Sequence, residues 1–308
     1  MQTVTFNAIE KLDFRTKESY KTLRTNLEFS GKDRRVISVT SSTPNEGKTS
    51  VSFQLAISIA EGGKKVILVD ADLRKSVLKG RYKSNASRYG LSHYLSGQAS
   101  ISEICCKTNI PNFYVIFSGP VPPNPSELLG NDAFELLLEY LRKEYDYVIV
   151  DTPPLGSVID GAVAAQHCDG TVIVIESGAI SYKFAQKVKE QLEKVDCRIL
   201  GVILNKVNMS GKGYYGAYYG KYYGKYYGKY YGNDDEGGLH AAVGQKGTKA
   251  AKAVKGDTGE RSHEGKNGSG SGKEKGLEEN GYPEDDMIQL DIDMVQLVED
   301  TETIEELK

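Results

Sequence analysis

Between residues 36 and 204 the chain alternates short apolar runs with longer amphipathic stretches. Near-continuous valine, isoleucine and leucine are typical of parallel strands buried on both faces, and they occur here in VISVTS, KVILVD, FYVIFSG, YDYVIVD, GTVIVIE and RILGVILN. The intervening stretches predict helices, namely TSVSFQLAISIAEGG, SELLGNDAFELLLEYLRKEY and SYKFAQKVKEQLEKV. This alternation predicts an α/β fold with a doubly wound, mostly parallel sheet.

A further amphipathic helix is predicted before the first strand, at about residues 15–30. Its pattern places Tyr20, Leu23 and Leu27 on one face, which would pack against the rest of the domain. We therefore assign residues 1–208 to one domain that begins with this helix.

Beyond that domain the strand and helix pattern stops. Residues 209–232 contain five Tyr-Tyr-Gly units. Residues 233–281 are rich in Gly, Lys, Glu, Ser and Asn, a composition that buries too little apolar area to offset chain entropy and predicts a disordered linker. The acidic segment 282–308 fits both helical and strand periodicity, so its structure and role stay open.

Composition narrows the function classes. The 39 basic and 42 acidic residues nearly balance, which argues against a dedicated nucleic-acid binder. The four cysteines form no C-x-x-C pair and the first residues contain no apolar signal core, so we expect reduced thiols in a cytoplasmic protein. No run approaches the roughly 18 apolar residues of a membrane span, and direct membrane insertion is not expected.

The segment SSTPNEGKT, residues 41–49, follows a predicted strand and opens a predicted helix. This is the context of a phosphate-binding loop, in which backbone N–H groups cradle phosphates, Lys48 adds a positive charge and the Thr49 hydroxyl faces Mg²⁺. Ser42 stands where the consensus has its first glycine. The residues expected to bind ATP here are Ser42, Thr43, Pro44, Asn45, Glu46, Gly47, Lys48, Thr49 and Ser50.

Three aspartates follow two other predicted strands. Asp70 and Asp72 end VILVDAD, and Asp151 ends YVIVD. Carboxylates at the carboxyl ends of parallel strands face the crevice where open α/β sheets bind ligands, and oxygen donors suit Mg²⁺. An aspartate after a strand is often only a helix cap, but three of them behind a phosphate loop favour a nucleotide site.

These motifs together resemble the bacterial tyrosine kinases (BY-kinases) of capsule and exopolysaccharide systems. The resemblance covers about residues 14–232 and includes the phosphate loop, the doublet V-D-A-D-L-R, the strand I-V-D-T-P-P, the segment SGPVPPNPSELL and the tyrosine-rich tail. It implies a fold of the P-loop NTPase type, ATP and Mg²⁺ as cofactors, and protein-tyrosine kinase activity.

The resemblance also implies roles for individual residues. Lys48 would bind the phosphates, and Asp70 would take the proton of the acceptor tyrosine. Asp72 is implied in catalysis through the metal ion. The implied Mg²⁺ ligands, direct or through water, are Thr49, Asp72 and Asp151.

Asn205, at the end of the last predicted strand, lies where related nucleotide-binding folds place a contact to adenine. An ordinary turn asparagine is an equally good interpretation of this position.

The family builds a ring of subunits through an E-x-x-R-x-x-R motif on an early helix. Here the corresponding residues are Glu18, Lys21 and Arg24, in which Lys21 keeps the charge of the middle arginine but loses its bidentate fork. The resemblance implies a subunit contact, whereas the spacing alone also fits an exposed ion pair within one helix.

The tail is the expected substrate. Its glycines give it reach, and tethering to the ring supplies a roughly millimolar effective concentration. Ten phosphates would add roughly 15 to 20 negative charges and are expected to drive subunits apart. The expected sites of autophosphorylation in trans are Tyr214, Tyr215, Tyr218, Tyr219, Tyr222, Tyr223, Tyr226, Tyr227, Tyr230 and Tyr231.

By the same resemblance we expect a membrane activator protein of a polysaccharide export system, a phosphotyrosine phosphatase, and recruitment to the inner face of the plasma membrane through the activator. Two other functions are considered. A partitioning or septum-placement ATPase would carry an extra lysine where this chain has Thr43. A non-enzymatic scaffold would use the Tyr/Gly tail for self-association.

Overall fold

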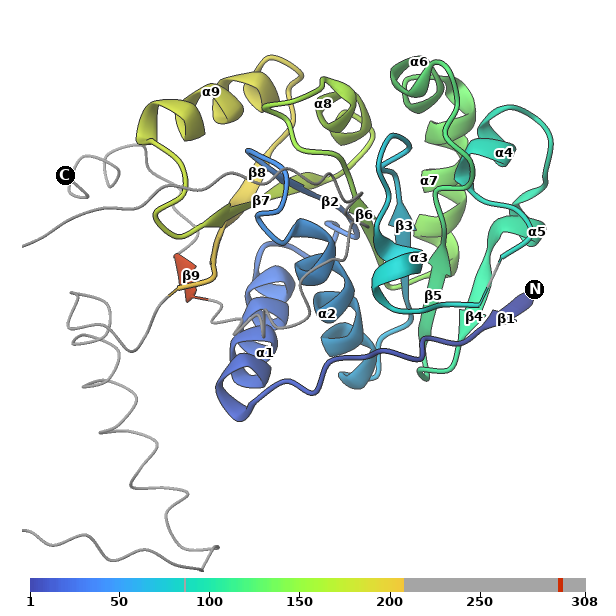
Figure 1. The fold of residues 1–308 in the computed structure, drawn as a ribbon, viewed down its shortest axis with the longest axis horizontal. Coiled ribbons are helices and arrows are strands. Elements are labelled where there is room, and N and C mark those ends of the chain that lie inside the picture. The colour runs from blue at the N-terminus through green and yellow to red at the C-terminus, as the bar shows by residue number, and fades with distance from the viewer. Residues whose placement is uncertain (86, 208–292, 296–308) are drawn as a thin grey trace, which may run out of the picture. The chain divides into compact units, whose positions relative to one another are not determined.

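The computed structural model describes residues 1–85, 87–207 and 293–295, which all belong to one compact unit. Its centre is a nine-stranded sheet (Figure 1). The strands are β1 (Gln2–Val4), β2 (Val36–Ser41), β3 (Val66–Asp70), β4 (Cys106–Thr108), β5 (Phe113–Ile116), β6 (Tyr147–Asp151), β7 (Gly170–Glu176), β8 (Ile199–Asn205) and β9 (Asp293–Val295). All six predicted strands are present, while the short strands β1, β4 and β9 are additions.

The spatial order of the strands is β1-β4-β5-β3-β6-β2-β7-β8-β9. Only the β4–β5 and β8–β9 pairs are antiparallel. The predicted mostly parallel, doubly wound sheet is therefore confirmed. Its four most central strands are almost completely buried, because helices cover both faces and leave no polar side to the strand pattern.

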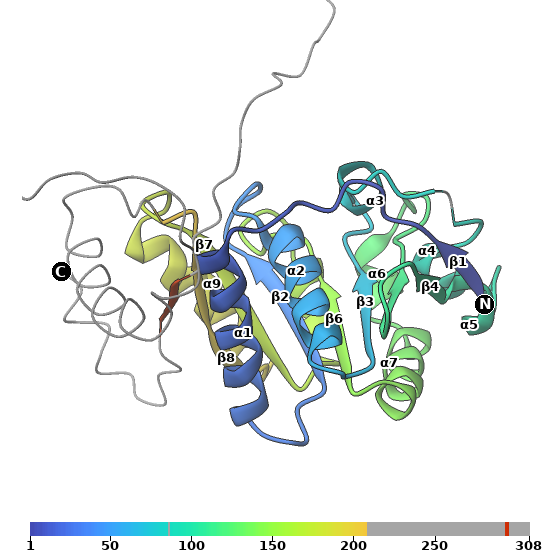
Figure 2. The same ribbon diagram turned by 90° about the horizontal axis from the view of Figure 1, so that it is seen from below.

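Two helices, α1 (Phe14–Phe29) and α2 (Lys48–Glu61), pack on one face of the sheet, and a larger group covers the other face (Figures 1 and 2). That group contains α4 (Leu91–Leu95), α5 (Ile101–Ile104), α6 (Pro125–Leu129), α7 (Asp132–Glu144), α8 (Asp160–Ala165) and α9 (Tyr182–Glu193). A single turn, α3 (Leu78–Arg81), follows β3 and packs its Leu78 with the α1 and α2 core.

The long helix predicted from SELLGNDAFELLLEYLRKEY is wrong in one respect, since the segment forms two helices, α6 and α7. Gly130 ends the first helix. Asn131 then caps the second, because its side chain accepts the backbone N–H of Phe134 at 3.1 Å. The sequence contains both signals, a glycine that ends one helix and an asparagine that caps the next, and the prediction did not use them.

The first helix matches its prediction closely. Asp13 caps α1 by accepting the backbone N–H of Thr16 at 3.0 Å. The predicted apolar face, Tyr20, Leu23 and Leu27, is buried in the core shared with α2. All four cysteines of the chain are unbridged, and none of the helices in the described ranges has the length and hydropathy of a membrane span.

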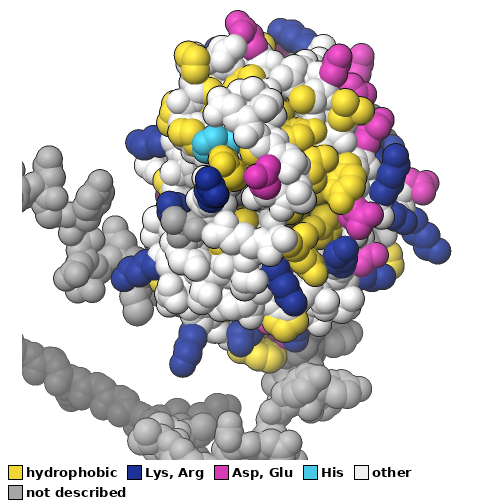
Figure 3. Space-filling model, turned by 90° about the vertical axis from the view of Figure 1, so that its right-hand side faces the viewer, with side chains coloured by type: hydrophobic (Ala, Val, Ile, Leu, Met, Phe, Trp, Pro, Cys, Tyr) yellow, Lys and Arg dark blue, Asp and Glu magenta, His cyan; other side chains and the backbone are white. Residues whose placement is uncertain are grey.

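The side of the domain where β1, α4 and α5 lie carries an exposed band of apolar side chains (Figure 3). Basic and acidic side chains border this band. Its apolar groups are interrupted by polar surface, as on the surfaces of ordinary folded proteins.

Replacing Tyr20 by phenylalanine is expected to raise the free energy of unfolding by roughly 1 kcal/mol. Its hydroxyl is buried and has no hydrogen-bond partner among the described residues, so the native state bears an uncompensated desolvation cost. Urea unfolding of the full chain measures the change. Tyr82→Phe is the matched control, because that buried hydroxyl bonds to Ser50 and its loss should destabilise by a similar amount. Equal destabilisation by both changes would contradict the expectation.

Candidate active site

The carboxyl ends of β3, β6, β2, β7 and β8 lie side by side at one edge of the sheet, and the predicted site residues follow them. Asp70 and Asp151 are direct partners in the β3–β6 register, and Val39 of β2 pairs with Asp151. The topology thus brings the two aspartate strands and the phosphate loop together.

The phosphate loop runs from the end of β2 to the start of α2. Gly47 caps the helix with φ of 94°, a backbone conformation that favours glycine. A Cβ atom at this position would lie 2.2 Å from Nδ2 of Asn205. Both the backbone angle and the crowding therefore require glycine.

Three side chains fix the conformation of this loop through hydrogen bonds. The buried carboxylate of Glu46 accepts the backbone N–H of Thr43 at 2.7 Å and lies 3.4 Å from the N–H of Glu176, and burial raises its pKa. Asn205 donates to the Glu46 carbonyl at 2.8 Å, and Lys206 donates to the Asn45 carbonyl at 2.9 Å. The loop is thus fastened to the ends of β7 and β8. The side chain of Glu46 turns inward and supports the loop, and the expected contact of Glu46 with ATP stays a prediction.

A cavity of about 410 Å³ opens in front of the loop. Among the residues predicted to bind ATP, Ser42, Thr43 and Glu46 lie outside its lining. The predicted residues that line it are Pro44, Asn45, Gly47, Lys48, Thr49, Ser50, Asp72 and Asn205. No site role was predicted for the remaining lining residues, which are Arg74, Lys75, Val77, Arg81, Pro153, Pro154, Ser157, Val158 and Lys206.

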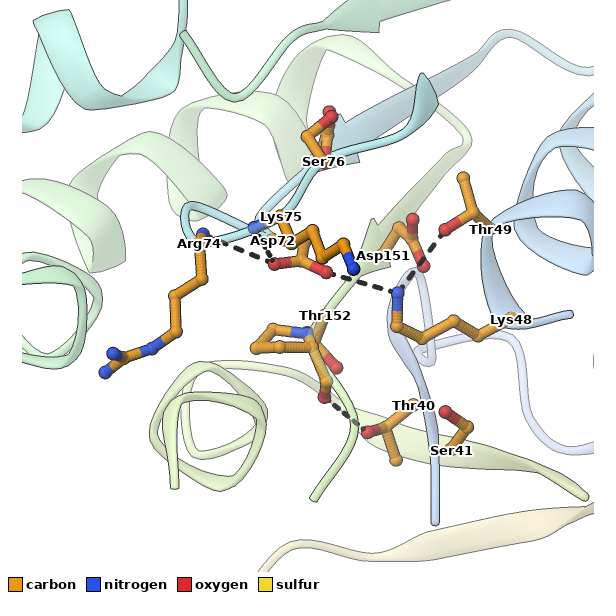
Figure 4. Close-up of polar contacts among 12 residues, drawn as sticks. Thr40, Ser41, Lys48, Thr49, Asp72, Arg74, Lys75, Ser76, Asp151 and Thr152 are labelled. Atoms are coloured by element: carbon orange, nitrogen blue, oxygen red, sulfur yellow. Dashed lines mark hydrogen bonds and ion pairs between the residues drawn. The ribbon is translucent and has the colours of Figure 1, made fainter. Parts of the chain in front are cut away.

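Lys48 and Asp72 both line this cavity and form an ion pair (Figure 4). The Lys48 ammonium lies 3.3 Å from Oδ2 of Asp72 and 3.4 Å from the Thr49 hydroxyl. Burial alone would lower the pKa of Lys48, but the carboxylates of Asp151 and Asp72 outweigh burial and raise it. Lys48 therefore remains a cation in a partly buried place.

Asp72 is oriented by its own turn. Its Oδ1 accepts the backbone N–H of Lys75 at 2.9 Å and lies 3.3 Å from that of Arg74. The other oxygen, Oδ2, stays directed at Lys48 (Figure 4). One carboxylate oxygen is thus used for positioning, and the other is presented to the site.

Asp70 and Asp151 lie deeper, each only 1% exposed. The Ser76 hydroxyl donates to Asp70, and the Ser52 hydroxyl lies 3.4 Å from Oδ1 of Asp151. Burial, together with the nearby Asp151, raises the pKa of Asp70 to about 7, so this carboxyl exchanges a proton near neutral pH. Burial likewise raises the pKa of Asp151, against the effect of Lys48.

The chain is similar to a family of known proteins. A family model described as an AAA domain matches residues 34–204. The tyrosine-protein kinase CpsD of Streptococcus agalactiae is 45% identical over 200 residues, which are 65% of this chain and 87% of that protein. The tyrosine-protein kinase YwqD of Bacillus subtilis is 40% identical over 204 residues, 65% of this chain and 86% of that protein.

The chain belongs to the bacterial tyrosine kinases. It is a protein-tyrosine kinase with a nucleotide-binding fold. The solved kinase domain of Escherichia coli tyrosine kinase ETK is 36% identical to it, with a TM-score of 0.58 over 60% of this chain and 73% of that one. The predicted family and enzyme class are confirmed.

The donor atoms of the kinase site suit ATP with Mg²⁺. The described ranges contain no cluster of three or more His, Cys, Asp or Glu side chains that could hold a metal alone. Mg²⁺ commonly takes one or two carboxylates and completes its shell with water and substrate phosphates, which fits the Thr49 hydroxyl with Asp72 and Asp151. The buried Oδ1 of Asn205, a residue that lines the cavity, has no hydrogen-bond partner in the described part of the chain.

One ion pair of the kinase was missed by sequence reasoning. Arg74 donates two hydrogen bonds to the buried Asp160, from Nε to Oδ2 at 2.7 Å and from Nη2 to Oδ1 at 3.0 Å. Asp160 starts α8, so the pair joins the turn after β3 to the helix after β6. The D-A-D-L-R motif alone does not identify the carboxylate with which its arginine forms an ion pair.

The residues predicted to join subunits all have partners within the kinase itself. Glu18 and Lys21 form an exposed ion pair of 2.6 Å on α1. Arg24 donates to the carbonyl of Ser58 at 2.6 Å and so ties α1 to the end of α2. The exposed pair matches the simpler interpretation of the spacing, and the subunit contact stays a prediction.

The ten tail tyrosines and the linker 233–281 lie outside the described residues. In the acidic segment 282–308 only β9 is described, and it pairs antiparallel with β8. The predictions for the tail therefore stay predictions.

Proposed function

We propose that this kinase uses Mg-ATP to phosphorylate tyrosines of its own tail in trans within a ring-like oligomer. The supporting observation is the gathering of the phosphate loop, Lys48 and Asp72 around one cavity, with the buried Asp70 and Asp151 paired at the ends of the neighbouring strands β3 and β6. The tail begins a few residues after β8, which contributes Asn205 to the same cavity.

In this proposal the chain positions charge and accepts a proton. Lys48 binds the phosphates, and the metal ion, held by Thr49, Asp72 and Asp151, neutralises charge when bound. The phenol oxygen bonds to the terminal phosphorus, the bond to the ADP oxygen breaks, and the phenol proton passes to Asp70. A phenol of pKa near 10 reaches the site neutral, so a carboxyl that exchanges protons near pH 7 suits this role.

We further propose that the activity regulates capsular or exopolysaccharide polymerisation and export. The family supports this role, with a membrane activator that recruits the kinase to the plasma membrane and a phosphatase that resets the tail. Subunits would associate through the face of α1 that carries Glu18, Lys21 and Arg24. The charge added by phosphorylation opposes that association.

A two-chain mixture tests the trans reaction. One chain carries Lys48→Met with an intact tail, and the other keeps its site but has all ten tail tyrosines replaced by phenylalanine. With Mg-ATP, phosphopeptide mass spectrometry should find phosphotyrosine on the tail of the Lys48→Met chain, and neither chain alone should produce it there. If the activator is needed, its cytoplasmic segment is added to every arm.

Other outcomes identify other functions. ATP hydrolysis by the wild type without phosphotyrosine would favour a partitioning-type ATPase. Neither activity would favour a scaffold. Phosphorylation of wild type with none in the mixture would show that the kinase and its tail must share one chain.

A further inference from the structure

Five basic side chains line the cavity, and three of them are already paired with carboxylates. Lys48 pairs with Asp72 at 3.3 Å, Arg74 with Asp160 at 2.7 Å, and Lys206 with Glu176 at 2.9 Å. The remaining two, Lys75 and Arg81, have no ion pair or side-chain hydrogen bond within residues 1–85, 87–207 and 293–295. They are the cations whose charge the described chain leaves uncompensated.

Lys75 is also held in a defined place. Its backbone N–H donates to Oδ1 of Asp72 at 2.9 Å, so its position depends on a proposed metal ligand. Its side chain extends from the turn past Asp72 toward Lys48 and Asp151, whereas the neighbouring Arg74 points away (Figure 4). The ammonium of this exposed, flexible side chain therefore lines the cavity without a carboxylate partner among the described residues.

The two lysines reach the cavity lining from different strands. Lys48 starts α2 behind β2, and Lys75 comes from the turn that follows β3. The phosphate loop itself supplies a single cation, Lys48, since position 43 is a threonine. The backbone N–H of Thr43 is already bonded to the Glu46 carboxylate. A triphosphate carries more negative charge than one lysine and one metal ion offset, and most of the extra charge lies on the terminal phosphate.

We infer that Lys75 binds the terminal phosphate of ATP, opposite Lys48. This inference rests on the proposed function, because it deepens the role of the same site. Lys75 distinguishes ATP from ADP, since only ATP presents the phosphate that lies beyond the reach of the loop. Its contact persists on the phosphoryl group as the group moves to tyrosine.

The test is nucleotide binding by the full chain, measured by titration calorimetry with Mg²⁺. A non-hydrolysable ATP analogue should bind Lys75→Met about 10- to 100-fold more weakly than wild type, the range expected for a lost hydrogen bond to a charged group. The affinity for ADP should stay within about twofold. Lys75→Arg should recover most of the affinity for the analogue, because it keeps the charge.

The matched control is Lys79→Met. Lys79 is an exposed lysine on α3, four residues further along and outside the cavity lining, so its loss should change neither affinity. Unchanged analogue affinity in Lys75→Met overturns the inference, as does an equal loss of analogue and ADP affinity, which would indicate general damage to the site. Failure of the proposed function can be distinguished from failure of this inference. In that case the wild type would bind both nucleotides but form no phosphotyrosine.

Discussion

A Lys48→Met chain is expected to phosphorylate tyrosine at least about 100-fold more slowly than wild type. Removal of one preorganised charge that stabilises a transition state typically costs 100- to 1,000-fold. The change also leaves Asp72 and the buried Asp151 without their nearest cation, so the melting temperature should be checked. Phosphotyrosine formed per minute with saturating Mg-ATP is the measurement. Lys64→Met, in the exposed turn between α2 and β3, is the control and should keep full activity.

Asp70→Asn should be less damaging than Lys48→Met. Phosphoryl transfer depends mostly on positioning and charge neutralisation, and base removal contributes less. The asparagine also keeps a group that can bond to the Ser76 hydroxyl, which preserves the local geometry. A larger loss in Asp70→Asn, with nucleotide binding intact, would show that proton transfer limits the reaction and that this ranking is wrong.

The second large effect is expected from Gly47→Ala. The new methyl group meets the amide of Asn205, and the residue must keep φ of 94°, which strains an L-amino acid. We expect the free energy of unfolding to fall by about 2 kcal/mol or more, and ATP affinity to fall at least about tenfold as the bond between Asn205 and the loop is lost. Urea unfolding and calorimetric titration measure the two effects.

Gly63→Ala separates backbone strain from crowding. Gly63 has φ of 81°, but no atom lies within 4 Å of an added Cβ. Its replacement should cost roughly 1 kcal/mol of stability from the backbone alone and leave nucleotide affinity unchanged. If both glycine variants behaved alike, the contact with Asn205 would carry no weight.

Local patterns were enough to predict the frame of this kinase. The six central strands are near-continuous apolar runs, and α1, α2 and α9 are helices of three turns or more, so both kinds of element can be recognised without distant information. The short elements were missed for a physical reason. β1 and β4 have three residues each, and they pair with each other across about 100 residues of sequence, which no local period reveals.

The site divides in the same way. Lys48, Thr49, Asp72 and Asp151 stand in motifs whose chemistry is local, and the structure brings them together. The inward turn of Glu46, the Arg74–Asp160 pair and the unpaired Lys75 depend on which side chains meet across separate strands. These contacts span up to about 130 residues of sequence, so only the folded chain defines them.

The hydrogen bonds that hold the phosphate loop also determine how far this kinase can be truncated from its C-terminus. Asn205 and Lys206 close the nucleotide loop from β8, although they stand more than 150 residues after it. A chain ended at residue 204 would keep every phosphate-loop motif and yet lose two of the three side chains that hold the loop in shape. A catalytic fragment for crystallisation or screening therefore has to extend at least through Val207, and removal of the tail is harmless to the loop only beyond that point.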